Sequence, residues 1–311
     1  MSVIVHLSTL NQQCFNLALE DGSLEILIKR INIEDELELL NSLELVEKIA
    51  ITVHGLEYLI SKGILNHFIS ILQKDNDGAG GLVAEKLITI TGNIFRQSAQ
   101  LSQILLSLPI VEIYADKLEK QFHEMPVISA IGALGRHSIG QKYLQENGAL
   151  LLNLSPYFDC ADNDLKIILL NAVSEMFGNS LKDENPNIHT LYTSLSLNPP
   201  TTQIMLNFIR KPFFEVRKAA YSVLYAIAKF NWGISEIAAT PGLLDFLLNR
   251  QNEPEIEGLT WRFSIFEKIL ENPDGKQCVG IEKYYNILEY AKRGIVFVPG
   301  QSEPIVKKEI W

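Results

Sequence analysis

The sequence predicts an all-α protein in which stacked helical repeats form one elongated solenoid, and three observations lead to this prediction. Long segments place apolar residues at positions i, i+3, i+4 and i+7, which is the period of an amphipathic helix. The strict alternation that marks β-strands is sparse. A glycine or proline followed by an apolar run also returns at a nearly constant spacing along the chain.

The helical period is clearest in three segments, which read LVAEKLITITGNIF, LKIILLNAVSEMFGN and EVRKAAYSVLYAIAKF. Short breakers rich in Gly, Pro, Asn and Asp separate the helical segments, and each predicts a turn. These breakers occupy residues 75–81, 160–164, 182–187, 198–200 and 272–275. None of them is long or biased enough to be a domain linker, so residues 1–311 are predicted to form a single solenoid.

The repeat is visible when residues 54–73, HGLEYLISKGILNHFISILQ, are compared with residues 139–158, IGQKYLQENGALLLNLSPYF. Each has a glycine, a Tyr-Leu pair, a second glycine and then an apolar run. The second glycine belongs to a series of markers before apolar helices, namely Gly22, Gly63, Gly148, Gly242 and Gly280. Successive markers lie roughly 40 residues apart or about twice that, and Pro109 and Pro200 fall near the middle of the two long steps.

Units of this length with two or three helices are the signature of armadillo and HEAT solenoids. The repetition has a physical reason, because one unit cannot bury its apolar face alone and stacked neighbours can. The sequence therefore predicts an armadillo/HEAT-like α-solenoid.

Composition narrows the class of partner and the compartment. The formal net charge of −10 argues against nucleic acid as the main partner, since that affinity rests on Lys and Arg. A basic or amphiphilic protein partner is easier to accommodate. The three cysteines are far apart, which suggests neither a zinc ribbon nor a disulfide framework. The chain start lacks a basic signal region, and no segment reaches about 18 uninterrupted apolar residues. We expect no membrane partner and a cytoplasmic location, with the nucleus as a second possibility.

No catalytic motif is found. The one His-Glu pair, His123-Glu124, lacks the second histidine of a zinc protease motif. The glycines of DGAGG at 77–81 have no following Gly-Lys-Ser/Thr, so a turn is predicted there instead of a phosphate loop. No GxSxG motif is present, and no cysteine has an evident histidine partner. We therefore predict a protein that is not an enzyme, with no metal site and no cofactor.

Four segments carry a resemblance to a known family: HGLEYLISKG at 54–63, ALGRHSIGQKYLQENG at 133–148, KPFFEVRKAAYSVLYAIAKFNWGISEIAATPGLLDFLLNR at 211–250 and YYNILEYAKRGIVFVP at 284–299. They resemble the non-ATPase regulatory subunit 5 family of the 26S proteasome, a family of base-assembly chaperones. Within the third, FFEVRKAAYSVLYAIA resembles a HEAT helix in which Arg217 would be a structural hydrogen-bonding residue between neighbouring repeats. Family members are longer, which implies that this chain lacks the family's N-terminal repeats.

The resemblance implies a non-catalytic scaffold that binds the C-terminal domain of one proteasomal AAA ATPase, regulatory subunit 7, during assembly of the base. By holding the ATPase early, such a chaperone would block premature docking on the core particle. The alternative is a generic armadillo/HEAT adaptor that binds a peptide or helix of another partner. That function needs a regular ladder of Asn and Arg, which this sequence does not show at repeat spacing.

A partner-binding ridge is predicted from the phase of the markers. In residues 64–74, positions 65, 68, 69 and 72 form an apolar stripe, and polar residues lie on the other side. We expect the helix after each marker to line the concave side of the solenoid. We apply the same helical positions, counted from each marker, to the later helices. The residues found in this way, which we call the marker ridge, are His67, Ser70, Glu112, Leu152, Ser155, Phe246, Asn249 and Tyr284.

Leu152, Phe246 and Tyr284 are the candidate anchors of this ridge, because apolar groups on a polar ridge are common in interfaces. If the register shifts by one residue, they are core residues instead. A separate acidic segment at 33–48, IEDELELLNSLELVEK, is expected to be a solvated helix face, and the alternative is that it forms a docking surface for a partner.

Overall fold

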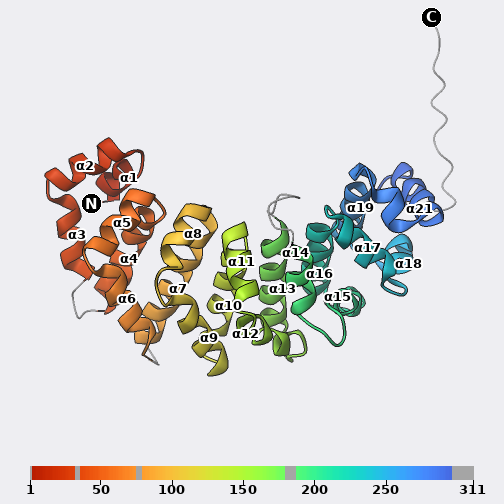
Figure 1. Ribbon diagram of the computed structural model, residues 1–311, viewed down its shortest axis with the longest axis horizontal. Coiled ribbons are helices and arrows are strands. Elements are labelled where there is room, and N and C mark those ends of the chain that lie inside the picture. The colour runs from red at the N-terminus through yellow and green to blue at the C-terminus, as the bar shows by residue number, and fades with distance from the viewer. Residues whose placement is uncertain (1, 32–35, 75–78, 179–186, 296–311) are drawn as a thin grey trace, which may run out of the picture.

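Every regular element in the described part of the chain is a helix. The computed structural model describes residues 2–31, 36–74, 79–178 and 187–295, and within these ranges no strand occurs. The helices stack side by side into a curved arc, with the first described helices at one tip and the last, α21 (Ile281–Lys292), at the other (Figure 1). The predicted all-α solenoid is confirmed. Of the predicted turns, residues 75–78 and 182–186 lie outside the described residues, as do residues 33–35 of the acidic segment.

Six helices of 11 to 19 residues form one continuous stack, the long-helix ladder, in which each member packs directly against the next. Its members are α4 (Glu36–Ala50), α7 (Ala79–Gln97), α10 (Glu124–Leu134), α13 (Asn163–Gly178), α16 (Phe214–Ile227) and α19 (Ile256–Glu271). Gly80 and Gly81 of the DGAGG segment lie in the first turn of α7, so these two glycines continue a helix instead of making a loop.

Two shorter helices precede each member of this ladder, and a seventh pair follows the last member. The first of each pair, the leading helices, are α2 (Gln12–Glu20), α5 (Val53–Ser61), α8 (Ala99–Leu105), α11 (Ser138–Glu146), α14 (Ile188–Ser194), α17 (Asn231–Ala239) and α20 (Gly275–Val279). The second, the marker helices, are α3 (Ser23–Ile31), α6 (Ile64–Leu72), α9 (Ile110–Glu119), α12 (Ala149–Leu152), α15 (Thr201–Ile209), α18 (Leu243–Leu248) and α21 (Ile281–Lys292). Short 3₁₀ helices extend two of them, η1 (Ser155–Phe158) after α12 and η2 (Arg250–Asn252) after α18.

The predicted markers are confirmed as the starts of the marker helices. The five glycines and the two prolines of the series each stand directly before one of these helices. Gly63 and Gly242 have φ angles of 73° and 75°, a left-handed conformation that costs other residues energy. The chain can therefore reverse from a leading helix into a marker helix within two or three residues.

Close packing in the long-helix ladder explains why the arc curves. A Cβ atom on Gly132 of α10 would lie 2.6 Å from the Cα atom of Ala172 in α13, and one on Gly92 would lie 3.2 Å from Ala130. Small residues thus bring neighbouring backbones of this ladder together, whereas consecutive marker helices pack less closely on one another.

The wider spacing of the marker helices falls on the outside of the curve. In Figure 1, α6, α9, α12 and α15 lie along the lower, outer border of the arc, and α8 and α11 lie along the inner one. The prediction that the marker helices line the concave side is therefore wrong. Helical phase can be read from sequence, but the direction of curvature depends on backbone spacings that no single repeat encodes.

The solenoid encloses one apolar core that runs from Val5 to Tyr290. A buried polar cluster crosses it near the C-terminal end, where the Arg217 guanidinium donates to the Glu253 carboxylate from Nε at 3.1 Å and from Nη2 at 2.8 Å. Arg217 also donates to the carbonyl oxygens of Lys211 and Pro212. The prediction that Arg217 is a structural residue between neighbouring repeats is confirmed.

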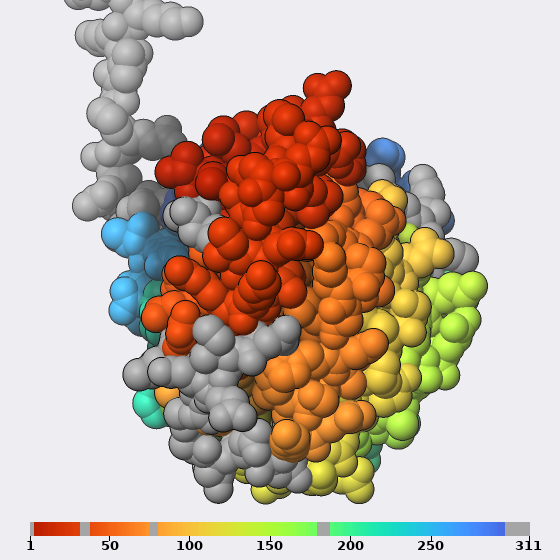
Figure 2. Space-filling view, turned by 90° about the vertical axis from the view of Figure 1, so that its left-hand side faces the viewer, coloured from red at the N-terminus to blue at the C-terminus, as the bar shows by residue number. Residues whose placement is uncertain are grey.

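The N-terminal end is closed by α1 (Ser2–Ser8), which packs against α2 and α4. Figure 2 looks onto this end, where α1 to α3 form the outermost layer. Several large apolar side chains are exposed there, namely Val3, Leu7, Leu10, Leu17 and Ile26.

Candidate partner-binding surface

The predicted marker ridge is only partly a surface. Ser70, Glu112 and Asn249 are exposed, and His67 and Ser155 are half-buried. Leu152, the last residue of α12, keeps 58% of its surface exposed. These residues lie on the outer border of the arc with their helices, and whether they bind a partner stays a prediction.

The two aromatic anchor candidates of that ridge pack against the core. Phe246 is half-buried, and its ring centroid lies 5.6 Å from the Arg210 guanidinium and 5.0 Å from that of Arg262. Tyr284 is also half-buried and contacts the core. Both therefore have a structural function, so of the three anchor candidates Leu152 has the most accessible side chain.

Two polar members of the ridge are engaged locally. The Asn249 side-chain oxygen accepts a hydrogen bond from the Gln251 backbone N–H at 3.1 Å, which caps η2. Glu112 accepts a hydrogen bond from the Tyr143 hydroxyl at 3.1 Å. Partial burial and then the negative charge of Glu112 raise the pKa of Tyr143, so this hydroxyl stays protonated at neutral pH.

The exposed side of the long-helix ladder, the long-helix face, carries a more extensive arrangement. Glu47 of α4 accepts hydrogen bonds from Lys86 Nζ at 2.7 Å and from Asn93 Nδ2 at 2.6 Å, both on α7. Arg96, one turn further along α7, donates to Asn93 Oδ1 at 2.7 Å. These contacts join α4 to α7 through side chains.

The same chain of contacts continues across α10 to α13. Arg96 holds the Glu175 carboxylate of α13 in a two-point ion pair, with Nε and Nη2 at 2.7 and 3.1 Å from its two oxygens. On the way it donates to Ser129 Oγ of α10 at 3.2 Å. Arg136 Nη1 lies 3.4 Å from Glu175. We call this set the cross-helix network: Glu47, Lys86, Asn93, Arg96, Ser129, Arg136 and Glu175.

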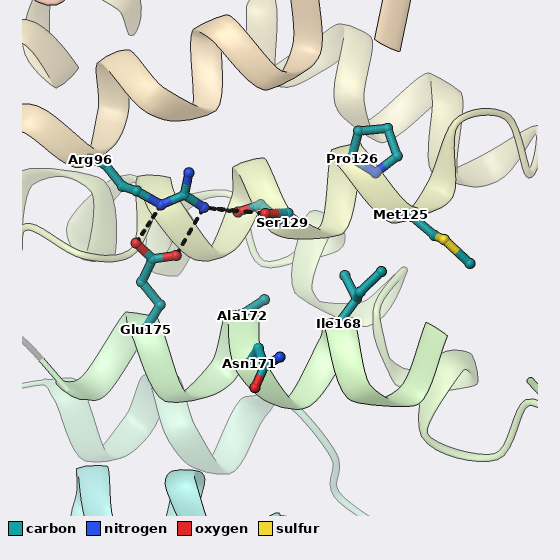
Figure 3. A pocket seen from close by; sticks show the side chains of 8 residues that line it. All are labelled: Arg96, Met125, Pro126, Ser129, Ile168, Asn171, Ala172 and Glu175. Atoms are coloured by element: carbon teal, nitrogen blue, oxygen red, sulfur yellow. Dashed lines mark hydrogen bonds and ion pairs between the residues drawn. The ribbon is translucent and has the colours of Figure 1, made fainter. Parts of the chain in front are cut away.

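A recess of about 370 Å³ lies beside the Arg96–Glu175 ion pair. Figure 3 shows the ion pair at one end and the apolar side chains at the other, with α10 and α13 forming the walls. The lining residues are Arg96, Met125, Pro126, Ser129, Ile168, Asn171, Ala172 and Glu175. The hollow exists because α10 and α13 present small side chains there, Ser129 and Ala172, between larger ones.

The C-terminal half of the long-helix face contains aromatic side chains. Tyr225 of α16 and Trp261 of α19 are half-buried and meet edge to face with ring centroids 5.7 Å apart. Nearby, Lys218 pairs with Glu257 at 2.7 Å. Trp, Tyr and Arg are the residue types most enriched at energetically important interface positions. This face therefore has the features of a protein-binding surface.

The groups on this face are suited to binding through ion pairs, hydrogen bonds and apolar contacts. Within the described ranges, no group of three or more His, Cys, Asp or Glu side chains is placed to hold a metal ion. Cys14, Cys160 and Cys278 are free thiols. In the same part of the chain, no helix has both the length and the apolar character needed to cross a membrane.

Sequence reasoning missed the long-helix face as a candidate site. The acidic segment at 33–48 was expected to be a solvated face, but Glu47 is engaged by Lys86 and Asn93. The network joins residues up to 79 positions apart, so no local motif announces it. The only available signal was the repeat itself, because Asn93, Arg96 and Arg136 stand at the C-terminal ends of α7 and α10.

Comparison with known proteins identifies relatives. The family model described as proteasome non-ATPase 26S subunit matches residues 1–309. The human 26S proteasome non-ATPase regulatory subunit 5 is 23% identical over 317 residues, and the protein of that name from Bos taurus is 24% identical over 316 residues. Each alignment covers 98% of this chain and 62% of the relative, so the chain spans less than two thirds of their length.

Comparison with solved structures finds the same architecture. A designed armadillo repeat protein in complex with the peptide (KR)4 aligns with a TM-score of 0.60 at 18% identity, covering 78% of this chain and 97% of the other. A second engineered protein aligns with a TM-score of 0.58 at 14% identity, covering 86% and 97%. At these identities the likeness shows the fold alone, and it confirms the armadillo-like solenoid.

Proposed function

This chain belongs to the proteasome non-ATPase 26S subunit family, and from that premise we propose that it is a non-catalytic assembly chaperone of the proteasome regulatory particle. In this function it binds the C-terminal domain of a proteasomal AAA ATPase, regulatory subunit 7, within the base subcomplex. While bound, it prevents premature docking of the ATPase on the core particle. It acts in the cytosol, or in the nucleus, without nucleic acid, membrane or cofactor.

The family match along nearly the whole chain carries this proposal. The relatives are named as non-ATPase regulatory subunits of the 26S proteasome, which supports a function in binding instead of catalysis. A repeat solenoid suits that function, because stacked repeats present an extended surface that a folded domain can contact at many points.

The long-helix face is the best-equipped surface for the partner. It combines the half-buried aromatic pair Tyr225 and Trp261 with the recess and the Arg96–Glu175 ion pair. A domain bound there would be covered on one side by the solenoid. Docking on the core particle would then be blocked by steric exclusion until the chaperone dissociates.

The alternative function, a generic adaptor for peptides, has one observation in its favour, the fold shared with a designed protein that holds the peptide (KR)4. The charges of the long-helix face argue against a basic peptide. Glu47 and Glu175 are already paired with the chain's own Lys86, Arg96 and Arg136. A basic peptide would have to displace these cations, so we favour a folded-domain partner.

Calorimetric titration of the purified chain with the isolated C-terminal domain of regulatory subunit 7 tests the proposal. We expect saturable one-to-one binding to the domain and no measurable binding to (KR)4. In a second step, core particle is added to the ATPase with and without a saturating amount of the chain. Reduced ATPase association with the core particle is expected only when the chain is present. Binding of (KR)4 without binding of the domain would favour the generic adaptor.

A further inference from the structure

The recess between α10 and α13 is large enough to receive one bulky side chain. Its volume of about 370 Å³ is near the lower end of the roughly 300–1,000 Å³ range of ligand pockets. It opens on the long-helix face, where Met125 keeps 38% of its surface exposed. We propose that this recess holds one uncharged apolar side chain, branched aliphatic or aromatic, which projects from the folded partner. This inference rests on the proposed function and assigns the anchor point of that interface.

The ion pairs beside the recess make a charged occupant less favourable than an apolar one. Arg96 is held by Glu175, Asn93 and Ser129, so an incoming carboxylate finds its donors engaged. An incoming ammonium or guanidinium would have to compete with Arg96 and Arg136 for the one carboxylate of Glu175. Displacing Arg96 would also break its two-point ion pair with Glu175.

The apolar end of the recess supplies what the occupant needs. Met125 and Pro126 of α10 face Ile168 of α13 across the opening (Figure 3). The flexible methionine can adjust to the shape of the entering group. Met125 and Ile168 are not fully covered within the chain itself, so an apolar side chain that covers them removes exposed apolar area from water.

The polar rim orients the backbone that carries the anchor. Asn171 is exposed at the edge of the recess, on the same helix as Ile168 and Glu175. Its amide both donates and accepts hydrogen bonds, so it can bond a partner backbone group beside the anchor. The ion pair fixes the opposite wall. A pocket with an apolar end and a polar rim is the environment in which interface hot spots occur.

Three variants of the full chain test this assignment by calorimetry against the isolated ATPase C-terminal domain. Met125→Glu places a charge at the apolar end, and its position in the first turn of α10 makes a carboxylate favourable for the helix. We expect at least a tenfold loss of affinity. Met125→Leu keeps the lining apolar and is expected to bind within threefold of the wild type.

Leu197→Glu is the matched control, since it makes the same change of charge at an exposed apolar position, between α14 and α15, that does not line the recess. We expect its affinity to stay within twofold of the wild type, and thermal melts of all variants separate lost binding from lost folding. If Met125→Glu binds normally, or Leu197→Glu lowers the affinity as much, the recess assignment is overturned while the chaperone function stands. If the wild type does not bind the domain, the proposed function is wrong and the recess assignment is withdrawn with it.

Discussion

Neutralising the carboxylate of Glu253 should strongly destabilise the C-terminal half of the solenoid. Its side chain is fully buried and accepts four hydrogen bonds. Two come from Arg217, one from the Tyr221 hydroxyl at 2.8 Å, and one from the Glu255 backbone N–H at 3.2 Å. A second buried guanidinium, that of Arg262, donates to Tyr221 at 3.0 Å. Glu253→Gln preserves the volume but leaves two buried cations without a counter-charge.

The size of the effect follows from that geometry. Removing one partner of a buried ion pair costs about 3–5 kcal/mol, because the remaining charge stays desolvated. With an unfolding entropy of about 2.1 cal/mol/K per residue, the 311-residue chain loses about 1.5 °C of melting temperature per kcal/mol. We therefore expect a decrease of about 5–8 °C in a calorimetric melt at neutral pH.

A matched control separates burial from charge. Glu257→Gln removes the carboxylate that pairs with Lys218, but that carboxylate keeps 51% of its surface exposed. Exposed ion pairs contribute about 0–1 kcal/mol, so the control should melt within about 2 °C of the wild type. Equal melting temperatures for the two variants would refute the reasoning, because they would show that burial of Glu253 adds nothing.

The pH dependence of the melting temperature is a second measurement of the contribution of the Glu253 carboxylate. Burial alone would raise the pKa of Glu253, but hydrogen bonds from Arg217 and Tyr221 outweigh it and hold the pKa below its ordinary value of 4.5. The ionised form is thus favoured by folding. Its contribution is fully present above the unfolded-state pKa and is lost as pH falls through the lowered native value. This acid-dependent loss should be absent from Glu253→Gln.

Three further outcomes are expected. Gly132→Ala should cost about 1–3 kcal/mol by forcing α10 away from α13, whereas Gly148→Ala, whose Cβ would approach no atom closer than 4.0 Å, should be neutral in the same melts. Phe246→Ala should lower the free energy of unfolding by about 2 kcal/mol, since the ring is half-buried against the core. Titration of this variant with the ATPase domain should show unchanged affinity. A normal melting temperature together with lost binding would show that Phe246 is an anchor after all. Glu175→Gln should cost about 1 kcal/mol because its ion pairs are partly exposed, and the difference from the wild type should shrink in 1 M salt; a salt-independent difference would contradict an electrostatic cause.

The repeat pattern could be predicted from sequence because it depends on local chemistry. A marker must reverse the chain between two helices, and Gly63 does so through a positive φ that a glycine tolerates. Pro109 and Pro200 were inferred from spacing alone, and α9 and α15 begin directly after them. Arg217 was recognisable because its neighbours are small residues in a long apolar helix.

The binding surface could not be predicted in the same way. Its position depends on which stack of helices packs more tightly, and that depends on pairs such as Gly132 and Ala172, which are far apart in sequence. The phase of a marker helix separates its buried side from its exposed side but does not say whether that side faces inward. For the same reason Phe246 was placed on a ridge, although Arg210 and Arg262 lie against its ring.

The Arg96–Glu175 ion pair joins α7 to α13 and so passes over α10, the helix between them. In a solenoid held only by contacts between adjacent repeats, each boundary can open independently and fraying proceeds inward from either tip. An ion pair between α7 and α13 changes this. The contact between α7 and α10 cannot open without also straining the contact between α10 and α13, because the ion pair spans both. Backbone amides of α7, α10 and α13 should consequently exchange with deuterium as one cooperative block, more slowly than those of the terminal helices. The middle of the chain would then act as a stiff segment between two compliant arms that can adapt to a rigid partner.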